Sequence, residues 1–304
     1  MEERRIKLAN RKNVMPQFWP IIIDEVIPLL TISSIFIAIV GFLLPYFSFL
    51  LYEVNVNLNL LFASFFLIFA IYSLNKLTDL KEDAVNVPDR AGFIEKNKRI
   101  VTWATIISYI AAFALSLLQN PYSILIILFP FCIGAIYSIK ISSFRLKDIT
   151  GVKNIVVALS WTVIGTFLPL AISFRDFRVI LLIFYFFFTK LFVNTVLFDV
   201  RDIEGDGQNE VKTIPVLFGR QKTKNLLLLL NSTFIPWLAV SYLAGYFHQY
   251  LFVFIFAIAY GYWYILHFCK EGLKIGKSLD LLVDGEWIPI VLLCVITHYF
   301  VGVA

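Results

Sequence analysis

Residues 71–90 read IYSLNKLTDLKEDAVNVPDR, where an apolar segment of membrane-spanning length ends in a run of polar side chains. Asn75, Asp79 and Asp83 are spaced i, i+4 and i+8. On a helix this spacing places the amide and both carboxylates along one face, so that their oxygens point the same way. The stretch therefore predicts a membrane helix that ends in an oxygen-rich face.

A second acidic stretch, LFDVRDIEGD at residues 197–206, also ends an apolar run. Asp199, Asp202 and Asp206 are spaced i, i+3 and i+7, which again places three carboxylates on one helical face. Two such faces at the ends of two membrane helices indicate one shared divalent-metal site.

Composition places the chain in a membrane, because 60% of its residues are hydrophobic and its mean hydropathy is +0.82. Backbone polar groups in lipid are satisfied within helices or closed barrels, and the apolar windows lack the alternation of barrel strands. We expect an all-α integral membrane protein with about nine transmembrane helices around a central cavity, since a span needs about 20 apolar residues. The expected spans are 26–48, 57–80, 100–118, 121–139, 152–173, 178–199, 224–245, 249–268 and 286–303.

Lysine and arginine are concentrated in alternate predicted loops, with Arg175 and Arg178 as the exception. The net charge is +5, but cations in short loops between apolar spans are orientation signals and argue against nucleic-acid binding. The N-terminal segment 1–20 and both acidic stretches are therefore expected on the cytoplasmic side. No large soluble domain interrupts the chain, so residues 1–304 are expected to form one domain with cap loops over 75–100 and 199–222.

Clustered Asp and Asn oxygens beside Lys and Arg are what a magnesium-bridged diphosphate requires. Mg²⁺ takes oxygen ligands and is usually held by a few carboxylates together with substrate phosphates. Arg and Lys in the same loops would bind the remaining phosphate oxygens. Because the site lies in a membrane, the other end of the substrate is expected to be apolar, as in an isoprenyl diphosphate.

The pattern N-x3-D-x3-D that starts at Asn75, followed by N-x-P-x-R at residues 86–90, resembles the first signature of the UbiA superfamily of intramembrane prenyltransferases. The pattern D-x2-D-x3-D that starts at Asp199, followed by KTIP at residues 212–215, is similar to the second. The resemblance extends over essentially the whole chain. It implies a helical barrel around a central cavity, a cap of loops over a cytoplasmic-side active site, a lateral opening to lipid, and Mg²⁺ as the cofactor.

The same resemblance implies roles for individual residues. Metal and diphosphate ligands would be Asn75, Asp79, Asp83, Asp199, Asp202 and Asp206, of which Asp79, Asp199 and Asp202 are the expected catalytic residues. Phosphate contacts would be Arg90, Lys140, Lys147, Lys153 and Lys212, and Tyr137 would face the allylic cation. Lys76 departs from the family pattern, which often has Asp there, and Ala91 replaces a frequent Pro; the number of metal ions and the acceptor class are therefore left open.

The function we expect is transfer of an isoprenyl group, of geranyl to geranylgeranyl length or longer, from its diphosphate to an acceptor, with release of diphosphate. An aromatic or quinone-precursor acceptor is preferred, and an ether-lipid glycerol-phosphate acceptor is the close alternative. An ion-coupled transporter is the alternative of a different class, although that function favours acidic residues near mid-membrane rather than at helix ends. The expected partners are thus the prenyl diphosphate, a lipophilic or aromatic acceptor, and membrane lipid.

Two further polar residues lie inside an expected span. Lys190 and Asn194 fall within 178–199, and a cation inside a membrane span needs a partner. Lys190 either contacts substrate or pairs structurally, and the sequence leaves both alternatives open. The aromatic run 184–188 is expected to pack or to face lipid.

Overall fold

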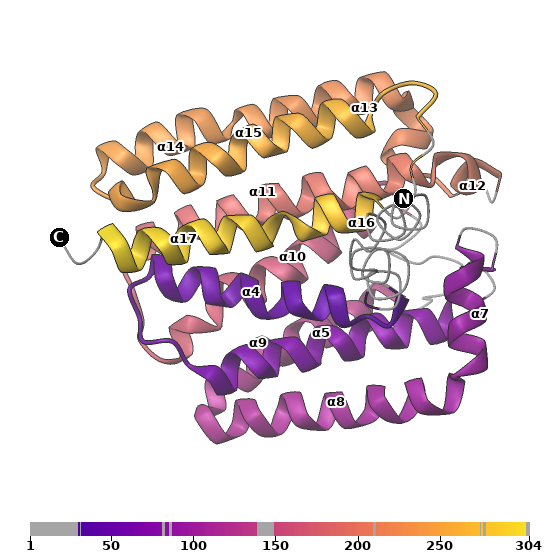
Figure 1. The fold of residues 1–304 in the computed structure, drawn as a ribbon, viewed down its shortest axis with the longest axis horizontal. Helices are drawn as coiled ribbons and strands as arrows, with labels where there is room; N and C mark the ends of the chain where they lie inside the picture. Colours follow the sequence, from indigo (N-terminus) through magenta and orange to yellow (C-terminus); the bar gives the residue numbers. More distant parts are fainter. Residues whose placement is uncertain are drawn as a thin grey trace, which may run out of the picture.

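The computed structural model describes residues 30, 32–80, 83–84, 87–138, 149–208, 211–273, 275 and 278–301, with backbone alone for 134–138 and 301. Its described residues contain helices and no strand (Figure 1). The α-helices are α4 (Ile35–Leu51), α5 (Leu58–Thr78), α7 (Pro88–Lys96), α8 (Lys98–Gln119), α9 (Pro121–Ser138), α10 (Val152–Phe167), α11 (Phe177–Arg201), α12 (Ile203–Gln208), α13 (Ile214–Ser232), α14 (Phe234–Leu243), α15 (Leu251–Phe268), α16 (Ser278–Val283) and α17 (Trp287–Val301). Short 3₁₀ turns are η3 (Pro169–Ala171), η4 (His248–Tyr250) and η5 (Asp284–Glu286).

The expectation of an all-α integral membrane protein is confirmed. Six helical segments among the described residues are long and apolar enough to cross a membrane, namely 58–78, 98–119, 152–171, 177–201, 214–243 and 248–268. Three other expected spans correspond to the shorter apolar helices α4, α9 and α17. The count of nine spans therefore stays a prediction.

One helix begins before the membrane span predicted in it. The span is expected at 224–245, whereas α13 begins at Ile214, so Arg220, Lys222 and Lys224 are helical. Gly219 has non-helical backbone angles (φ 77°, ψ 158°), so α13 consists of two helical pieces that meet at a kink there. A glycine accepts this conformation at little cost, whereas most other residues would not.

Helix starts follow from local chemistry where a polar side chain precedes an apolar run. Asn57 caps α5 by accepting a hydrogen bond from the backbone N–H of Leu60 (3.1 Å). Asp176 caps α11 in the same way, accepting from the backbone N–H of Arg178 (2.8 Å). Such caps satisfy backbone donors that a helix leaves without partners.

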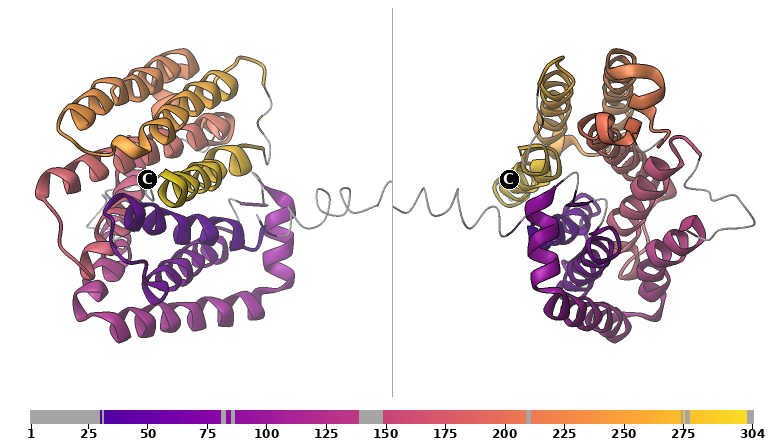
Figure 2. Two further views of the ribbon diagram at one scale, coloured as in Figure 1. Left: turned by 60° about the vertical axis from the view of Figure 1, so that its left-hand side comes forward. Right: turned by 90° about the vertical axis from the view of Figure 1, so that its right-hand side faces the viewer.

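The long helices form a closed ring of packing contacts. Going round it, α4 packs on α5, α5 on α8 and α9, α9 on α10, α10 on α11, α11 on α13, α13 on α15, α15 on α17, and α17 back on α4. The end-on view shows this arrangement around the middle of the molecule (Figure 2). Helices α7, α12 and α16 gather at one end of the ring, on the right of Figure 1.

An aromatic cluster fills the interior on one side of the ring. Phe186 and Phe187 from α11 are buried against Phe47, Phe254 and Trp287, with ring centroids 5.1–6.3 Å apart. The prediction that the run 184–188 packs is thus confirmed for its buried members. Ring contacts of this kind stabilise a fold by more than the burial of their apolar surface alone.

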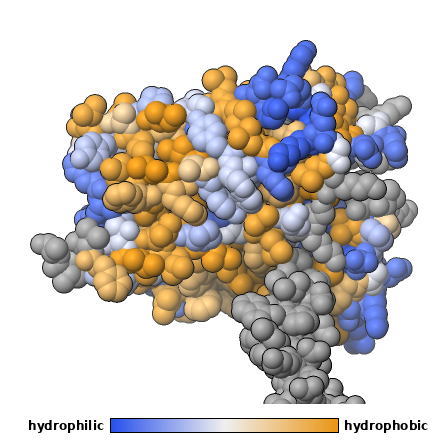
Figure 3. Space-filling model, turned by 45° about the horizontal axis from the view of Figure 1, so that its top comes forward, coloured by the Kyte–Doolittle hydropathy of each residue, from blue (hydrophilic) through white to orange (hydrophobic). Residues whose placement is uncertain are grey.

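The outside of the molecule is apolar over most of the face shown in Figure 3, and hydrophilic side chains gather mainly at its ends, most strongly at the right-hand end. Large hydrophobic side chains such as Leu118 (76% exposed) and Phe252 (81% exposed) point outward. An apolar belt of this extent on a helical ring is typical of a surface that faces lipid.

Candidate active site

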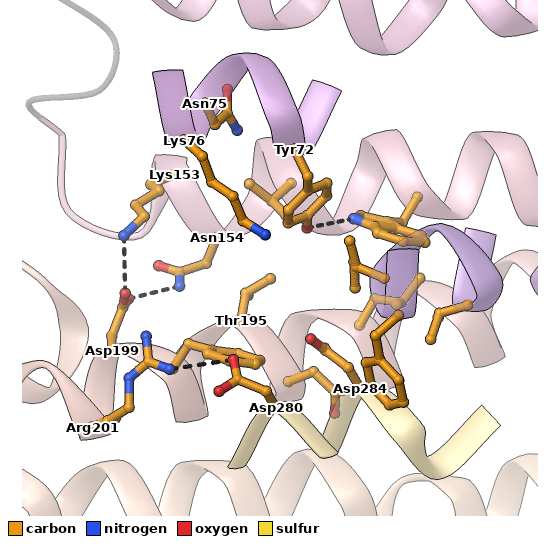
Figure 4. A pocket seen from close by; sticks show the side chains of 18 of the residues that line it. Tyr72, Asn75, Lys76, Lys153, Asn154, Thr195, Asp199, Arg201, Asp280 and Asp284 are labelled. Atoms are coloured by element: carbon orange, nitrogen blue, oxygen red, sulfur yellow. Dashed lines mark hydrogen bonds and ion pairs between the residues drawn. The ribbon is translucent and has the colours of Figure 1, made fainter. Parts of the chain in front are cut away.

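A cavity of about 300 Å³ opens inside the ring at the end where α7, α12 and α16 lie. Its walls come from α4, α5, α10, α11 and the α16–η5 segment, so elements far apart in sequence share it (Figure 4). The polar side chains that line it are Tyr72, Asn75, Lys76, Arg90, Lys153, Asn154, Asn194, Thr195, Asp199, Arg201, Asp280 and Asp284. Both acidic stretches therefore contribute to one polar cavity.

The first acidic stretch continues the hydrogen-bonding pattern of α5 beyond its last residue. The backbone N–H of Asp79 bonds to the carbonyl of Asn75 (2.9 Å), and that of Asp83 to the carbonyl of Asp79 (2.9 Å). Asn75 lines the cavity, whereas Asp79 is exposed and accepts a hydrogen bond from Thr78. Asp83 is buried and forms a two-point ion pair with Arg90, whose Nε lies 2.9 Å from Oδ2.

The second acidic stretch has Asp199 as its innermost carboxylate. Asp199 is 2% exposed and accepts from Asn154 Nδ2 (2.7 Å) and Lys153 Nζ (3.3 Å), both on α10. Asp202, one turn further on, accepts from both Nε (2.8 Å) and the terminal nitrogen (2.9 Å) of Arg201.

Asp206 differs from the other acids because its Oδ2 is buried and has no hydrogen-bond partner among the described residues. Burial raises the pKa of Asp206 to about 6; Lys153 opposes this rise, and the nearby Asp199 and Asp202 carboxylates add to it. A cation beside Asp206 would give the buried oxygen a partner and would lower the pKa of the carboxyl by offsetting the neighbouring negative charges.

The structure brings four of the predicted site residues to the cavity wall, namely Asn75, Arg90, Lys153 and Asp199. Asp83 and Asp202 do not line the cavity themselves, but they bind Arg90 and Arg201, which do. Asp79, Asp206 and the exposed Lys212 do not line the cavity either. In the part of the chain that the structure describes, no three His, Cys, Asp or Glu side chains are close enough to hold a metal ion by themselves. Lys140, Lys147 and the side chain of Tyr137 lie outside the described residues.

Several cavity residues were not predicted as site residues. Lys76, which sequence comparison marks as a departure, is buried, lines the cavity, and donates to the carbonyl of Ile32 (2.9 Å). Asp280 and Asp284 lie one helical turn apart in LDLLVDGEW, just before the last apolar segment, and Asp280 pairs with Arg201 (3.4 Å). The sequence signal was present, because this acidic pair also borders an apolar run.

The alternatives left open for Lys190 are decided by its contacts. Its Nζ lies 2.7 Å from Glu286 Oε2, 2.9 Å from the carbonyl of Ala257 and 3.2 Å from the hydroxyl of Tyr264. Asn194 donates to the other Glu286 oxygen (3.0 Å) and also lines the cavity. Lys190 therefore pairs structurally, with a partner that the sequence pattern does not reveal.

A second cavity of about 400 Å³ lies next to the first, between α5, α8, α9 and α10, and is mainly apolar. The two cavities share Tyr72, Asn75, Val157 and Trp161 as wall residues. Trp161 Nε1 donates to the hydroxyl of Tyr72 (3.1 Å) and the rings meet edge to face, so this pair forms the wall between a polar and an apolar space.

The ring of apolar helices and the mixed acidic and basic cavity at one end define a polytopic membrane protein with an internal polar site. Residues 34–273 match the UbiA prenyltransferase family, and the chain therefore belongs to that family. The resemblance seen in the two acidic stretches is thereby confirmed.

The chain is similar to two digeranylgeranylglyceryl phosphate synthases over about half of its length. The chain is 32% identical over 169 residues, 52% of its length, to the digeranylgeranylglyceryl phosphate synthase of Saccharolobus solfataricus, and 28% identical over 182 residues, 55% of its length, to that of Sulfurisphaera tokodaii. These matches span 57% and 60% of the length of the two relatives.

Solved structures share the fold. A UbiA homolog from Archaeoglobus fulgidus bound to GPP and Mg²⁺ superimposes with a TM-score of 0.66 at 20% identity, covering 90% of this chain and 99% of the homolog. A structure of digeranylgeranylglyceryl phosphate synthase gives a TM-score of 0.58 at 18% identity, covering 87% of this chain and 94% of that one. At these identities the likeness establishes the helical fold alone.

Proposed function

We propose that this protein transfers an isoprenyl group from its diphosphate to a hydroxyl of a glycerol-phosphate lipid and releases diphosphate. The observation that carries the proposal is a single cavity in which Asn75 and Asp199, one from each acidic stretch, lie beside Arg90 and Lys153. The two relatives named as digeranylgeranylglyceryl phosphate synthases support the lipid acceptor, which was the alternative in the sequence analysis. The aromatic acceptor stays a prediction that none of these comparisons supports.

The residues of the site suit Mg²⁺. Its donors are amide and carboxylate oxygens, and the buried, unsatisfied Oδ2 of Asp206 is the kind of atom that a metal ion or its bound water would satisfy. The predicted ligands, of which a subset would bind each Mg²⁺ ion together with substrate phosphates, are Asn75, Asp79, Asp83, Asp199, Asp202 and Asp206. When bound, Mg²⁺ would neutralise charge that develops on the leaving diphosphate.

The chain's own residues would bind and orient the two ends of the substrate. Arg90 and Lys153 would donate to diphosphate oxygens, because both reach the cavity and both are positively charged. The rings of Tyr72 and Trp161, which line the same cavity, would lie beside the prenyl carbons and stabilise positive charge on them. Tyr137 keeps its predicted role facing the cation.

Sidedness follows from charge. The end of the ring that carries the cavity also carries Arg90, Lys96, Lys98 and Arg99, in α7 and the start of α8. Cytoplasmic loops are enriched in Lys and Arg. We therefore infer that the site lies on the cytoplasmic side. The N-terminal segment 1–20, predicted on the same side, lies outside the described residues.

The experiment that tests the proposal is incubation of purified protein in detergent with geranylgeranyl diphosphate, Mg²⁺ and either geranylgeranylglyceryl phosphate or 4-hydroxybenzoate. We expect diphosphate release and an ether-linked product with the first acceptor, and loss of both in excess chelator. Product formed with 4-hydroxybenzoate but not with the glycerol-phosphate lipid would instead support the aromatic acceptor preferred in the sequence analysis. No turnover and no Mg²⁺-dependent thermal stabilisation by prenyl diphosphates would contradict both proposals and make ion flux in vesicles the next assay.

A further inference from the structure

Asp284 occupies a different position from the acids of the two motifs. It lies at the start of η5 and lines the cavity from the wall opposite α5, facing Tyr72 and Lys76 across the space in Figure 4. Its carboxylate makes no hydrogen bond or ion pair with any other described residue. By contrast, Arg90 binds Asp83, Lys153 binds Asp199, and Arg201 binds Asp202.

Hydrogen bonds of the neighbouring residues fix the backbone turn that carries Asp284. The neighbouring Glu286 is fully buried and bonded to both Lys190 and Asn194, and Asn194 also reaches the carbonyl of Val283 (3.4 Å). These bonds fix the 3₁₀ turn while the Asp284 side chain remains in the cavity wall. A group that is held in this way is pre-organised toward whatever occupies the cavity.

The surroundings of Asp284 favour its binding a proton. Asp284 is half-buried, and the apolar wall residues of its cavity include Phe36, Ile37 and Trp287. Burial raises the pKa of Asp284 well above its usual range, and the neighbouring Asp280 raises it further. A carboxylate with a raised pKa is a stronger base than one paired with a cation.

The proposed reaction needs such a base. When a hydroxyl attacks a prenyl carbon, the carbon–oxygen bond to diphosphate breaks and its electron pair leaves with the diphosphate. A lone pair of the hydroxyl oxygen forms the new carbon–oxygen bond, and the O–H electrons return to that oxygen. The hydroxyl proton must then go to a group near the acceptor, and the motif acids Asp83, Asp199 and Asp202 are already paired with cations.

We propose that Asp284 is a catalytic residue that accepts the proton lost by the acceptor hydroxyl. This inference rests on the proposed function, because it presumes a hydroxyl acceptor. It adds a third functional segment, on α16–η5, to the two acidic stretches. After each turnover the proton leaves Asp284 for water.

The role predicts a pH dependence with a definite sign. The charged and titratable groups around Asp284 are Asp280 on α16, Arg201 on α11, Glu286 on η5, and Tyr72 and Lys76 on α5. The deprotonated carboxylate is the active form, so the single-turnover rate should rise with pH through the pKa of Asp284. The raised pKa moves this rise above the range of an ordinary aspartate.

The test compares Asp284→Asn and Asp284→Glu with wild type, using full-length protein in detergent. Each is assayed for thermal stabilisation by geranylgeranyl diphosphate with Mg²⁺ and for single-turnover ether formation at several pH values. We expect Asp284→Asn to bind the diphosphate as wild type does, to lose at least about 100-fold in rate, and to lose the rise with pH. Asp284→Glu should regain part of the rate, with the rise at a different pH. The matched control Glu95→Gln, an exposed acid on α7, should change neither property.

The outcomes separate this inference from the proposed function. Wild type that forms no product with any hydroxyl acceptor would overturn both. Product formation by Asp284→Asn within about two-fold of wild type, or equal loss of diphosphate binding and rate, would overturn the role of Asp284 alone. If Asp284→Asn does not fold, the test is Asp284→Glu. A single-turnover rate that rises at the same pH in this variant as in wild type would overturn the role of Asp284.

Discussion

The Lys190 ammonium donates to the Glu286 carboxylate over 2.7 Å, with side chains that are 1% and 0% exposed. The pair joins the middle of α11 to the turn that begins α17, 96 residues later in the chain. Asn194 and Tyr264 complete the hydrogen bonds around it. Because these groups lie just beneath the cavity, they support the wall that carries Asp280 and Asp284.

Breaking this pair from one side should be costly. Glu286→Leu leaves a buried ammonium without its counter-ion, which typically costs about 3–5 kcal/mol, whereas removing both charges is often nearly neutral. We therefore expect Glu286→Leu to lower the thermal midpoint in detergent sharply, and the double variant Lys190→Met with Glu286→Leu to recover most of the loss. A double variant no more stable than Glu286→Leu would contradict this account.

Gly261 on α15 is required by the same network. A Cβ at this position would lie 2.3 Å from Asn231 Oδ1 and 3.2 Å from Lys190 Nζ. Overpacking of this kind usually costs about 1–3 kcal/mol, so Gly261→Ala should lower the thermal midpoint. Gly92→Ala is the control, because a Cβ there meets nothing within 4 Å and a helical alanine is favourable. Equal midpoints for the two variants would show that Asn231 and Lys190 move aside freely.

Lys153 and Lys212 were both predicted to contact phosphate, and the structure distinguishes them. Lys153 lines the cavity, whereas Lys212 is exposed and does not. A hydrogen bond to a charged group contributes about 1.5–3 kcal/mol, so Lys153→Ala should raise the KM for prenyl diphosphate by roughly 10- to 150-fold. Lys212→Ala should change it much less. Equal effects on KM would place Lys212 in the site as well.

Loss of the innermost carboxylate should stop the chemistry without unfolding the protein. Asp199→Asn keeps the shape of the side chain near Asn154 and Lys153 but removes its charge. We expect diphosphate release to fall by at least about 100-fold, since the change removes a candidate metal ligand. The thermal midpoint without substrate reports folding. Wild-type turnover in this variant would remove Asp199 from the catalytic residues.

The wall between the two cavities should limit the prenyl chain. Trp161→Ala removes the ring that separates the polar cavity from its apolar neighbour. We expect kcat/KM for geranylgeranyl relative to geranyl diphosphate to rise by about five-fold or more, because added methylenes gain apolar contacts. Trp161→Phe keeps most of the wall and is the matched control. An unchanged ratio of the two kcat/KM values would show that the prenyl chain of the substrate does not enter the apolar cavity.

Much of the fold could be predicted from the sequence because long apolar runs and helix-end acids are local signals. The two acidic stretches could be recognised from spacing alone, and one residue of each, Asn75 and Asp199, lines the cavity. The partners of Lys190 and Arg201 could not, because Glu286 and Asp280 are brought to them by closure of the ring between α17 and α4. Lys76 was a departure in the motif, and its contact with the carbonyl of Ile32 depends on where α4 begins.

The ion pairs at the cavity have a thermodynamic consequence for ligand binding. Arg90 with Asp83, Lys153 with Asp199, and Arg201 with Asp202 balance much of the local charge within the protein itself. A divalent ion arriving alone would compete with these cations, and a diphosphate arriving alone would compete with these carboxylates. When both arrive, acids and bases exchange partners together and no charge is left uncompensated. The two ligands should therefore bind with positive cooperativity, each strengthening the affinity for the other by the same factor.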